Sequence, residues 1–264
     1  LKKDKPDIIM LSMSGMGHTG PWKDFVAFGA TVQSLGGLTH LTSYDSKFPL
    51  GPGYAYADTI AGLYGAFAVL AALEFRDRTG EGVYIDLSQY EVVCSLIGPT
   101  LMEAAITNGS RIFPARSQAV DESASPYGCY KCLGIDRWCA IAVFNETQWH
   151  ALCKVLGWPE WSRMKKFSSL ANRKKHSREL DKFLESCTMK YHAEELASLL
   201  NEAGVPAGVV KNAKDLATDP HLLERNFFIR SEDPQFGETI LVESPIRFRQ
   251  GSLSRNWKTC LLYT

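Results

Sequence analysis

The sequence predicts a mixed α/β fold, and three observations support this prediction. Short apolar runs alternate with long apolar helices up to residue 112. A hairpin of two strands and several charged helices follow. Between these parts, near residue 115, the composition changes from Gly- and Ala-rich to charged and aromatic, so we place a domain boundary there.

The first part contains two predicted strands and two predicted helices. Asp7–Ser12 is a short apolar run, which is typical of a buried strand. Asp58–Arg76 carries apolar residues at helical spacing with Ala and Gly at most other positions, so we expect a helix that is buried on most sides. Val83–Leu87 alternates as a strand does. Ser88–Asn108 opens with a capping box and is predicted to be a second apolar helix.

The second part is predicted to begin with a linker and a hairpin. Arg111–Ser125 shows no sustained periodicity, which is typical of a linker. Tyr127–Cys132 and Trp138–Phe144 are the predicted strands of the hairpin. Asn145–Leu156 carries Asn and then Gln three positions later, a capping pattern that predicts a helix.

Further helices and strands are predicted toward the end of the chain. The helices cover His176–Cys187, Ala193–Ala203 and a segment that begins at Asp219–Pro220, where a capping residue precedes a proline at the first helical position. The strands are Val205–Val210 and two short strands within Phe227–Val242.

Composition and charge exclude several classes of protein. The 264 residues include 29 basic and 29 acidic side chains, and this balance argues against a nucleic-acid-binding protein. No uninterrupted apolar run approaches the roughly 20 residues of a membrane helix. Seven cysteines, an odd number scattered along the chain, are typical of reduced thiols in the cytoplasm. Leu1–Pro6 is charged and leads at once into a predicted core strand, so we expect no signal peptide and a chain that is incomplete at its beginning.

A glycine motif at Gly15–Gly20 permits two interpretations. It has the G-x-G-x-x-G spacing of dinucleotide-binding loops and follows a predicted strand. No amphipathic helix opens after Gly20, however, and no second strand ends in an acidic residue about 20 positions further on. We therefore favour a glycine-rich loop near an active site over an NAD site.

A group of cysteines and a group of basic residues each permit a functional and a purely structural interpretation. Cys129, Cys132 and Cys139 lack a fourth ligand at zinc-site spacing, so we predict structural cysteines and no metal site. The basic residues of Lys165–Lys166 and Arg173–Lys175 are predicted to form a solvated surface. The alternative for this basic surface is a contact with a phosphorylated ligand.

Asp58 is the leading candidate for chemistry. It lies at the start of a predicted helix, and because Asp is a good N-cap, capping is one interpretation. The other interpretation is a carboxylate nucleophile, since the free N–H groups and partial positive charge of a helix N-terminus favour the charged carboxylate. The small residues around it would leave room for a substrate. Taken alone, the residues favour the cap.

Several motifs, taken together in their order and spacing, resemble a known family. They are Ser12–Pro21, Leu35–Leu38, Ala57–Gly62, Ala71–Gly82, Ile85–Ser88, Trp138–Ala142, Gly204–Gly208 and Asp219–His221. With these motifs the sequence is similar to the family III CoA-transferases (the CaiB/BaiF type). The similarity extends from about Lys5 to Phe248.

The resemblance implies a CoA-transferase in which Asp58 is the catalytic residue. In this family the carboxylate attacks an acyl-CoA thioester to form a mixed anhydride, and the released CoA thiolate then forms an aspartyl-CoA thioester. The acceptor acid finally takes over the CoA. The implied substrates are an acyl-CoA and a carboxylic acid, so coenzyme A enters as a thioester substrate and no cofactor is bound permanently.

The resemblance also implies an architecture. Residues 1–112 would belong to a Rossmann-like large domain, 113–210 to a small α+β domain, and 211–264 to a returning linker. Subunits of this family interlock as dimers, so we expect a homodimer or a related heteromer. We expect it to act in the cytoplasm, without nucleic acid or membrane partners. The family's N-terminal part, with much of its CoA-binding surface, is expected to precede this chain.

The surroundings of the nucleophile are less defined by the resemblance. The tetrahedral intermediates of this mechanism carry an oxyanion, which needs hydrogen-bond donors. In some relatives the donors come from a glycine-rich loop, but the corresponding Ser117–Pro126 has no run of glycines. We assign the donor only to the region Ser123–Gly128. Phe28, Tyr54 and Tyr56 are candidates to line an acyl pocket, with plain packing as the alternative.

Two alternative functions share this resemblance. The α-methylacyl-CoA racemases pair the aspartate with a histidine that corresponds to about Ala27, and alanine cannot transfer a proton. Gly29 stands where some transferases carry a glutamate. A catalytically inactive partner subunit is the second alternative, and the presence of Asp58 argues against it. We therefore favour CoA transfer.

Overall fold

The computed structural model describes residues 2–43, 48–109, 123–233, 235 and 237–247, and the chain divides into two compact units. The division falls between Glu122 and Ser123. Helices and strands together form a mixed α/β fold, which confirms the predicted fold class. Most of the predicted linker Arg111–Ser125, and with it the predicted boundary after Ile112, lies outside the described residues. The predicted three-part division therefore stays a prediction.

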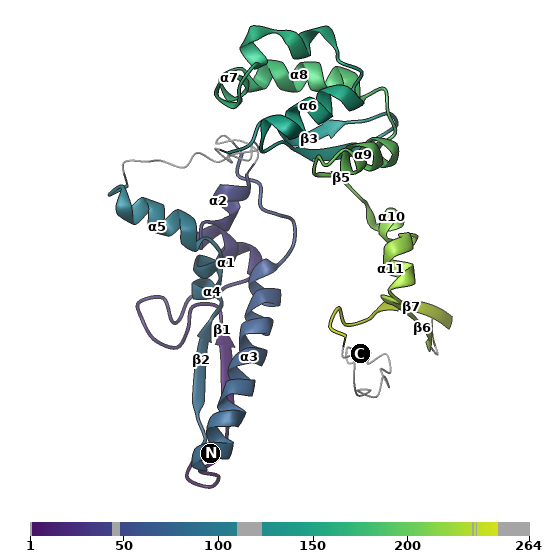
Figure 1. Cartoon of the computed structure of the whole chain (residues 1–264). Helices are drawn as coiled ribbons and strands as arrows, with labels where there is room; N and C mark the ends of the chain where they lie inside the picture. Colours follow the sequence, from purple (N-terminus) through teal and green to yellow (C-terminus); the bar gives the residue numbers. More distant parts are fainter. Residues whose placement is uncertain (1, 44–47, 110–122, 234, 236, 248–264) are drawn as a thin grey trace. The chain divides into compact units, whose positions relative to one another are not determined.

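The first unit is built on two parallel strands and one long helix (Figure 1). Strand β1 (Met10–Ser14) pairs with β2 (Tyr84–Ser88), with Met10 opposite Tyr84 and Ser14 opposite Ser88. Helix α3 (Tyr56–Thr79) lies along both strands. The sequence predicted all three elements, with small differences at their ends.

Helix α3 approaches the strands closely because small residues line its contact face. Its buried residues are Ala57, Ala61, Gly65 and Ala72. A Cβ atom on Gly65 would lie 2.8 Å from the sulfur of Met13 and 3.0 Å from Leu11 Cδ2. Any larger residue at position 65 would therefore push the helix away from β1.

The opposite face of α3 is exposed within the described residues, so the prediction of a helix buried on most sides is wrong. Leu63, Phe67 and Leu70 expose 63%, 74% and 65% of their surface. By length and composition alone α3 is also apolar enough to cross a membrane. Charged residues near both ends of α3 make its uninterrupted apolar run shorter than that of a membrane helix. Its stripe of small residues packs on two strands, as in a core helix.

Four shorter helices complete the described part of the first unit. They are α1 (Gly29–Leu35), α2 (Leu38–Thr42), α4 (Gln89–Leu96) and α5 (Gly98–Ile106). The single helix predicted after Ser88 is divided at Ile97, because Gly98 and Pro99 begin a new helix there. Ser88 caps α4, as predicted, and accepts a hydrogen bond from the Glu91 N–H at 3.3 Å.

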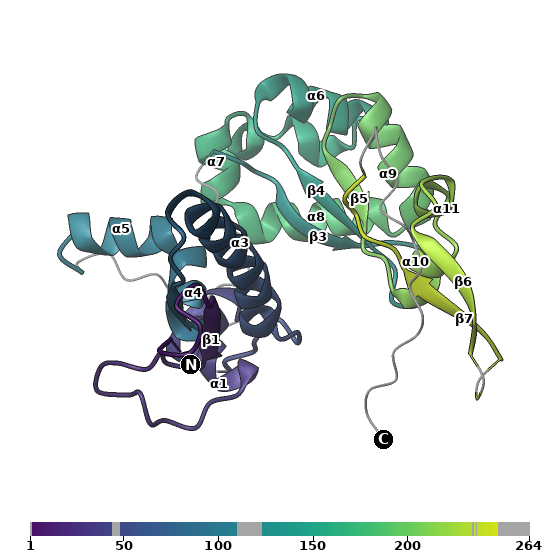
Figure 2. The ribbon, with the colours of Figure 1, turned by 90° about the horizontal axis from the view of Figure 1, so that it is seen from below.

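The second unit contains a three-stranded antiparallel sheet (Figure 2). Strands β3 (Tyr127–Lys131) and β4 (Trp138–Ala142) form the predicted hairpin, and β5 (Ala207–Val209) pairs with β4. Helix α8 (Ser177–Thr188) lies along β3, and helix α9 (Ala193–Glu202) lies along β4 and β5. The helices of this part are α6 (Glu146–Val155), α7 (Leu170–Lys175), α8 (Ser177–Thr188) and α9 (Ala193–Glu202), with short 3₁₀ turns at Glu160–Arg163 and Lys165–Phe167.

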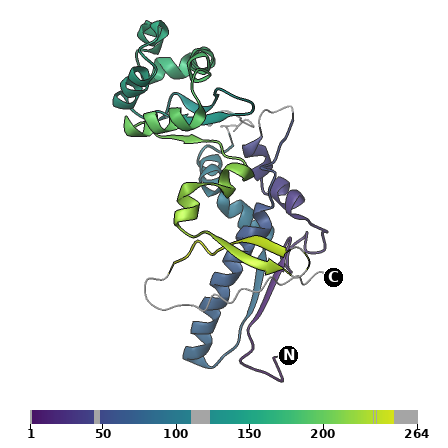
Figure 3. The ribbon, with the colours of Figure 1, turned by 90° about the vertical axis from the view of Figure 1, so that its right-hand side faces the viewer.

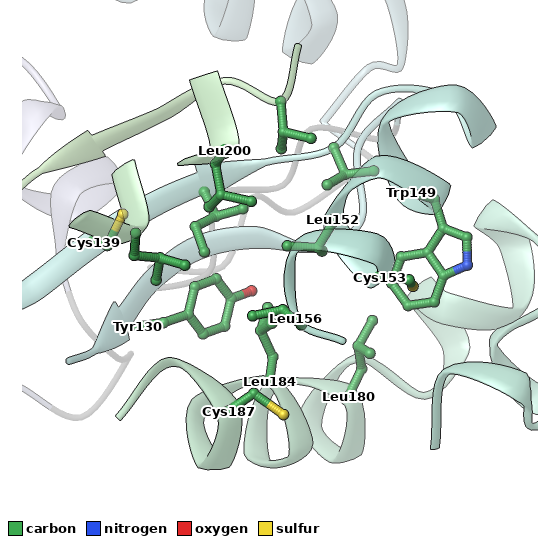
Figure 4. Packing of buried hydrophobic residues seen from close by; sticks show 14 of the residues in the cluster. Tyr130, Cys139, Trp149, Leu152, Cys153, Leu156, Leu180, Leu184, Cys187 and Leu200 are labelled. Carbon is green, nitrogen blue, oxygen red and sulfur yellow. The ribbon is translucent and has the colours of Figure 1, made fainter. Parts of the chain in front are cut away.

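One face of this sheet and its helices form the main core of the second unit (Figure 4). Alternate strand residues point into it, as a pleated sheet requires. The core includes Tyr130, Cys132, Cys139, Ile141, Leu152, Leu180, Leu184, Leu196 and Leu200. Cys132 and Cys139 are therefore buried packing residues, whereas Cys129 points to the other face and is exposed.

The remaining described residues form two short helices and a hairpin. The helices are α10 (Ala213–Ala217) and α11 (Pro220–Glu224). Asp219 caps α11, as predicted, and accepts a hydrogen bond from the Leu222 N–H at 2.9 Å. The strands β6 (Phe228–Asp233) and β7 (Gly237–Val242) pair antiparallel (Figure 3).

Arg173 is buried, so the prediction of a solvated basic surface is wrong at this position. Its side chain is 1% exposed. The guanidinium donates to both carboxylate oxygens of Glu146, at 2.7 and 3.1 Å, and to the carbonyl groups of Ser125 and Phe167, at 3.0 and 3.2 Å. It also lies 4.5 Å from the centre of the Trp149 ring. Each of the three guanidinium nitrogens thus has a hydrogen-bond acceptor in place of water, which is what permits its burial.

We expect the substitution Arg173→Met to destabilise the second unit by about 3 kcal/mol, because it leaves two buried carbonyl groups without a donor. Methionine keeps most of the length of the side chain, so the loss of hydrogen bonds dominates. Denaturant unfolding followed by tryptophan fluorescence measures the change. Lys175→Met is the matched control on an exposed side chain and is expected to stay within about 0.5 kcal/mol of wild type. Equal losses for both variants would contradict the prediction.

The contact between the buried Tyr130 and the half-buried Asp181 is expected to make stability depend on pH. The Tyr130 hydroxyl donates to Asp181 Oδ1 at 2.9 Å, and burial raises the pKa of this carboxyl above its usual value of 3.8. The folded protein thus binds this proton more tightly than the unfolded chain does. The stability that the carboxyl contributes is therefore greatest below the unfolded pKa and falls as pH rises through the folded pKa.

The substitution Asp181→Asn is expected to remove this fall, because the amide keeps an acceptor for Tyr130 and carries no charge. The free energy of unfolding of the variant, relative to wild type, should rise as the pH increases above about 4. Denaturant unfolding at several pH values measures it. A difference between variant and wild type that does not change with pH would contradict the prediction.

Candidate active site

Asp58 lies in the first turn of α3 and does not cap the helix. The helix begins at Tyr56 and its N-cap is Ala55, so the capping role that the residues alone favoured is wrong. The predicted helix began two residues too late. Asp58 is exposed, and the described residues offer its carboxylate no hydrogen bond or ion pair. The carboxylate is thus available to react with a substrate.

The start of α3 provides a favourable environment for a negative charge. The first N–H groups of a helix have no carbonyl partner within the helix, and together they carry a partial positive charge. The Thr59 N–H, which donates to the Ala55 carbonyl at 3.3 Å, begins the helical hydrogen-bond pattern. Asp58 precedes it, within the turn where the positive end of the helix dipole acts. This position stabilises the charged form that a nucleophile requires.

Gly29, the first residue of α1, lies directly against the Asp58 carboxylate. A Cβ atom on Gly29 would lie 2.7 Å from Asp58 Oδ2 and 3.6 Å from its Cγ. The same atom would lie 3.1 Å from the Ala55 Cβ. Real Cβ atoms do not approach another group so closely, so the absence of a side chain at position 29 provides the space that the carboxylate occupies.

Three exposed aromatic side chains come from the same two segments as Asp58 and Gly29. They are Phe28, Tyr54 and Tyr56. The rings of Tyr54 and Tyr56 meet edge to face with their centres 5.6 Å apart, and the Tyr54 hydroxyl accepts a hydrogen bond from Thr59 at 3.1 Å. Tyr54 and Tyr56 thus form an exposed aromatic pair at the start of α3, and Phe28 directly precedes Gly29. Exposed aromatic side chains of this type can bind apolar groups.

The glycine motif Gly15–Gly20 forms a loop and not the start of a helix. It follows β1, but α1 begins only at Gly29. The Tyr90 N–H, in α4, donates to the Gly15 carbonyl at 2.9 Å, and the His18 N–H donates to Asp86 Oδ2, in β2, at 3.0 Å. The loop therefore lacks the strand–turn–helix geometry of a dinucleotide site, in agreement with the interpretation that the sequence favoured.

Ala27 occupies a packing position. It contacts the core cluster formed by Met16, Val32, Ala57 and Val93. A Cβ atom on Gly15 would lie 2.5 Å from the Ala27 Cβ, so this part of the chain is tightly packed. A proton-transferring side chain is absent here, and a larger one would overpack the cluster.

The region Ser123–Gly128, where we expect the oxyanion donor, belongs to the second unit. The Ser125 N–H already donates to the Val143 carbonyl at 2.9 Å, and the Ser125 carbonyl accepts from Arg173. Pro126 has no N–H. The position of the oxyanion's hydrogen-bond donor thus stays a prediction. The backbone of Ser125 and Pro126 offers no free N–H for this role.

The other predicted sites have structural explanations. Lys165 and Lys175 are exposed, as a solvated surface requires, and Lys166 forms an ion pair with Glu179. Within the described ranges, no group of three or more His, Cys, Asp and Glu side chains is arranged to hold a metal ion.

Sequence comparison then identifies the family. The sequence model of CoA-transferase family III matches residues 1–259, which is nearly the whole chain. The chain belongs to CoA-transferase family III. The resemblance that the motifs suggested is therefore confirmed.

Similar proteins agree with this family III assignment. The chain is 31% identical over 233 residues to the succinyl-CoA–D-citramalate CoA-transferase of Chloroflexus aurantiacus, covering 88% of this chain and 57% of that protein. It is 28% identical over 255 residues to the human succinyl-CoA:glutarate CoA-transferase, covering 94% and 56%. The crystal structure of a CaiB/BaiF family protein from Brucella suis matches with a TM-score of 0.83 and 29% identity, covering 94% and 63%. The chain thus spans less than two thirds of the length of these relatives.

One residue of this candidate site is not indicated by any motif in the sequence. Gln33, in α1, is buried. Its Oε1 accepts a hydrogen bond at 2.6 Å from the backbone N–H of Tyr56, which is the first residue of α3. No motif marks this residue. The available signal was its spacing, because it follows Gly29 by four residues and so lies on the same face of a helix.

Proposed function

We propose that the protein transfers CoA from an acyl-CoA donor to a carboxylic acid, with Asp58 as the nucleophile. The observation that carries this proposal is the unpaired carboxylate of Asp58, placed in the first turn of α3 and against Gly29. Family membership supports the reaction class. The helix N-terminus supports the charged state of the nucleophile.

The first half of the proposed reaction removes the acyl group from CoA. A carboxylate oxygen of Asp58 attacks the thioester carbonyl carbon, the C–S bond breaks, and CoA leaves as a thiolate while a mixed anhydride forms. The thiolate then attacks the carbonyl carbon of Asp58 in the anhydride. The donor acid leaves as a carboxylate, and Asp58 carries CoA as a thioester.

The second half repeats these steps in reverse order with the acceptor. The acceptor carboxylate attacks the Asp58 thioester, releases the thiolate and forms a second anhydride. The thiolate attacks the acyl carbon of the acceptor, which forms the new acyl-CoA and returns Asp58 as a carboxylate. No atom is oxidised and no net proton is consumed. Because each intermediate is an anhydride or a thioester, an activated acyl group is present at every stage of the exchange.

For the substrates we propose succinyl-CoA as donor and a dicarboxylic acid as acceptor. The names of the relatives from Chloroflexus aurantiacus and human support this choice, since both are succinyl-CoA transferases that use such acids. We further propose that Phe28, Tyr54 and Tyr56 contact the acyl chain. Their exposure beside Asp58 supports this role.

The function is tested by incubating the full-length protein with succinyl-CoA and, in parallel, citramalate, glutarate, malate or mesaconate. Chromatography of the CoA thioesters is expected to show a new acyl-CoA that depends on one of these acceptors. Exchange of an α-proton in deuterated water, without acceptor-dependent transfer, would instead support a racemase. The packing role of Ala27 argues against that outcome.

For the assembly we propose an interlocked homodimer, or a related heteromer, acting in the cytoplasm. The name of one relative, the beta subunit of the succinyl-CoA–L-malate CoA-transferase of Chloroflexus aurantiacus, supports considering a heteromer. Light scattering of the purified protein distinguishes a monomer from a dimer. An inactive monomer that gains activity only with a second type of chain would support the partner-subunit alternative.

A further inference from the structure

Helix α1 contacts two neighbouring helices through residues spaced about one turn apart. Gly29 lies against the Asp58 carboxylate at the start of α3. Gln33, one turn later, bonds to Tyr56 at the same helix start. Gly36 lies against α4, since a Cβ atom there would be 2.4 Å from Val93 Cγ1. The helix therefore connects the beginning of α3 with α4.

The Gln33 side chain is a buried polar group with a defined partner. It is 5% exposed, and its Oε1 lies 2.6 Å from the Tyr56 backbone nitrogen. The same N–H also approaches the Tyr54 carbonyl, at 2.9 Å, within a tight turn. Because the first N–H groups of a helix have no partner inside it, an acceptor from outside is what fixes the first turn. At α3 the Tyr54 carbonyl is an acceptor from the preceding turn, and Gln33 is the acceptor from another helix.

We propose that Gln33 is a positioning residue for catalysis, which holds the first turn of α3 so that the Asp58 carboxylate stays over Gly29. This inference rests on the proposed function of Asp58. Gln33 does not touch the reacting atoms in the arrangement described, and it acts through Tyr56, two residues before the nucleophile.

The physical basis is that α1 contacts the start of α3 through Gly29 and contacts α4 through Gly36. Its C-terminal end is fixed on α4 by the close contact of Gly36 with Val93, and Val32 is fully buried in the core cluster between them. The Gln33 acceptor therefore lies on a helix that packs against α4. Loss of the acceptor would free the first turn of α3 to fray, and the carboxylate would then sample positions away from its space over Gly29.

The test compares two variants. Gln33→Met removes the acceptor but keeps a side chain of similar size, and Gln33→Asn keeps an amide acceptor on a side chain that is one methylene shorter. Ser88→Ala is the matched control, since it removes a buried side-chain hydrogen bond at the start of a different helix of the same unit. The measurements on the full-length protein are Tm, KM for succinyl-CoA, kcat, and the single-turnover rate of adduct formation at Asp58 with hydroxylamine present.

We expect Gln33→Met to lower kcat and the adduct rate by about 100-fold, and Gln33→Asn by about tenfold, with KM changed by less than about threefold. Ser88→Ala should lower Tm about as much as Gln33→Met does, because each removes one hydrogen bond at a helix start. It should leave kcat within about twofold of wild type. If Gln33→Met does not fold, Gln33→Asn decides the question. A kcat for the Gln33 variants equal to that of Ser88→Ala would overturn the positioning role. A wild-type protein that forms no adduct at Asp58 would overturn the proposed function itself, and the role of Gln33 with it.

Discussion

Replacing Asp58 by alanine is expected to abolish CoA transfer, with a fall in kcat of about 10⁴-fold or more, as for the removal of other covalent nucleophiles. In the proposed mechanism the two anhydrides and the thioester are all bonded to this carboxylate, so we expect no other group to complete the exchange when it is absent. The measurement is the formation of the new acyl-CoA from succinyl-CoA and the acceptor that the wild-type protein uses. The fold is expected to persist, because the described residues form no hydrogen bond with this side chain.

Asp77→Ala is the matched control on the same helix. Asp77 lies near the opposite end of α3, its side chain is 73% exposed, and its contact with Arg76 is long at 4.0 Å. Such an exposed ion pair contributes little to stability. We expect wild-type activity for Asp77→Ala. Comparable activities of the two alanine variants would remove Asp58 from the mechanism.

The second large effect is expected at Gly29. In Gly29→Ala the added methyl group would lie 2.7 Å from Asp58 Oδ2 in the present geometry, so the carboxylate must move. A displacement of about 1 Å at a reacting group costs roughly 100-fold in rate, and we expect a loss of kcat of that size. Stability should not fall by a comparable amount, because alanine is at least as favourable as glycine in a helix.

Gly98→Ala serves as the control for this substitution. Gly98 is also the first residue of a helix, α5, but a Cβ atom there meets nothing within 4 Å. Both variants add the same group at the same helical position, and only the one at Gly29 reaches the nucleophile. Thermal unfolding and kcat are measured for both. Full activity in Gly29→Ala would mean that the carboxylate does not react from this position.

Much of the fold follows from local patterns in the sequence. The helices α6, α8 and α9 have clear apolar periodicity, the strands β1 to β4 are short apolar or alternating runs, and α3 is a long apolar segment. Capping residues mark several of the helix ends. Helix α1 was not predicted, because Gly29 and Gly36 interrupt its pattern. Those glycines are required by tertiary contacts with Asp58 and Val93, which outweigh their poor helix propensity.

The site was predicted only in part, for the same physical reason. Asp58 was found because it stands at a helix start within a family motif, although its own role in that helix was misjudged. Arg173 was assigned to the surface because its sequence neighbours are lysines, and its partners Glu146 and Ser125 are distant in sequence. Gln33 is a polar residue whose partner lies 23 residues away, and its four-residue spacing from Gly29 is the one local sign of its position. Contacts of this type are set by packing between elements, so a local pattern does not show the partner.

The most direct test of the mechanism is the covalent state of Asp58 during the reaction. The full-length protein is incubated with succinyl-CoA and hydroxylamine, digested, and analysed by peptide mass mapping. The mechanism predicts a hydroxamate on Asp58, formed from the anhydride or the thioester, that disappears when succinyl-CoA is omitted. A protein that transfers CoA at its normal rate while Asp58 stays unmodified would contradict the proposed mechanism.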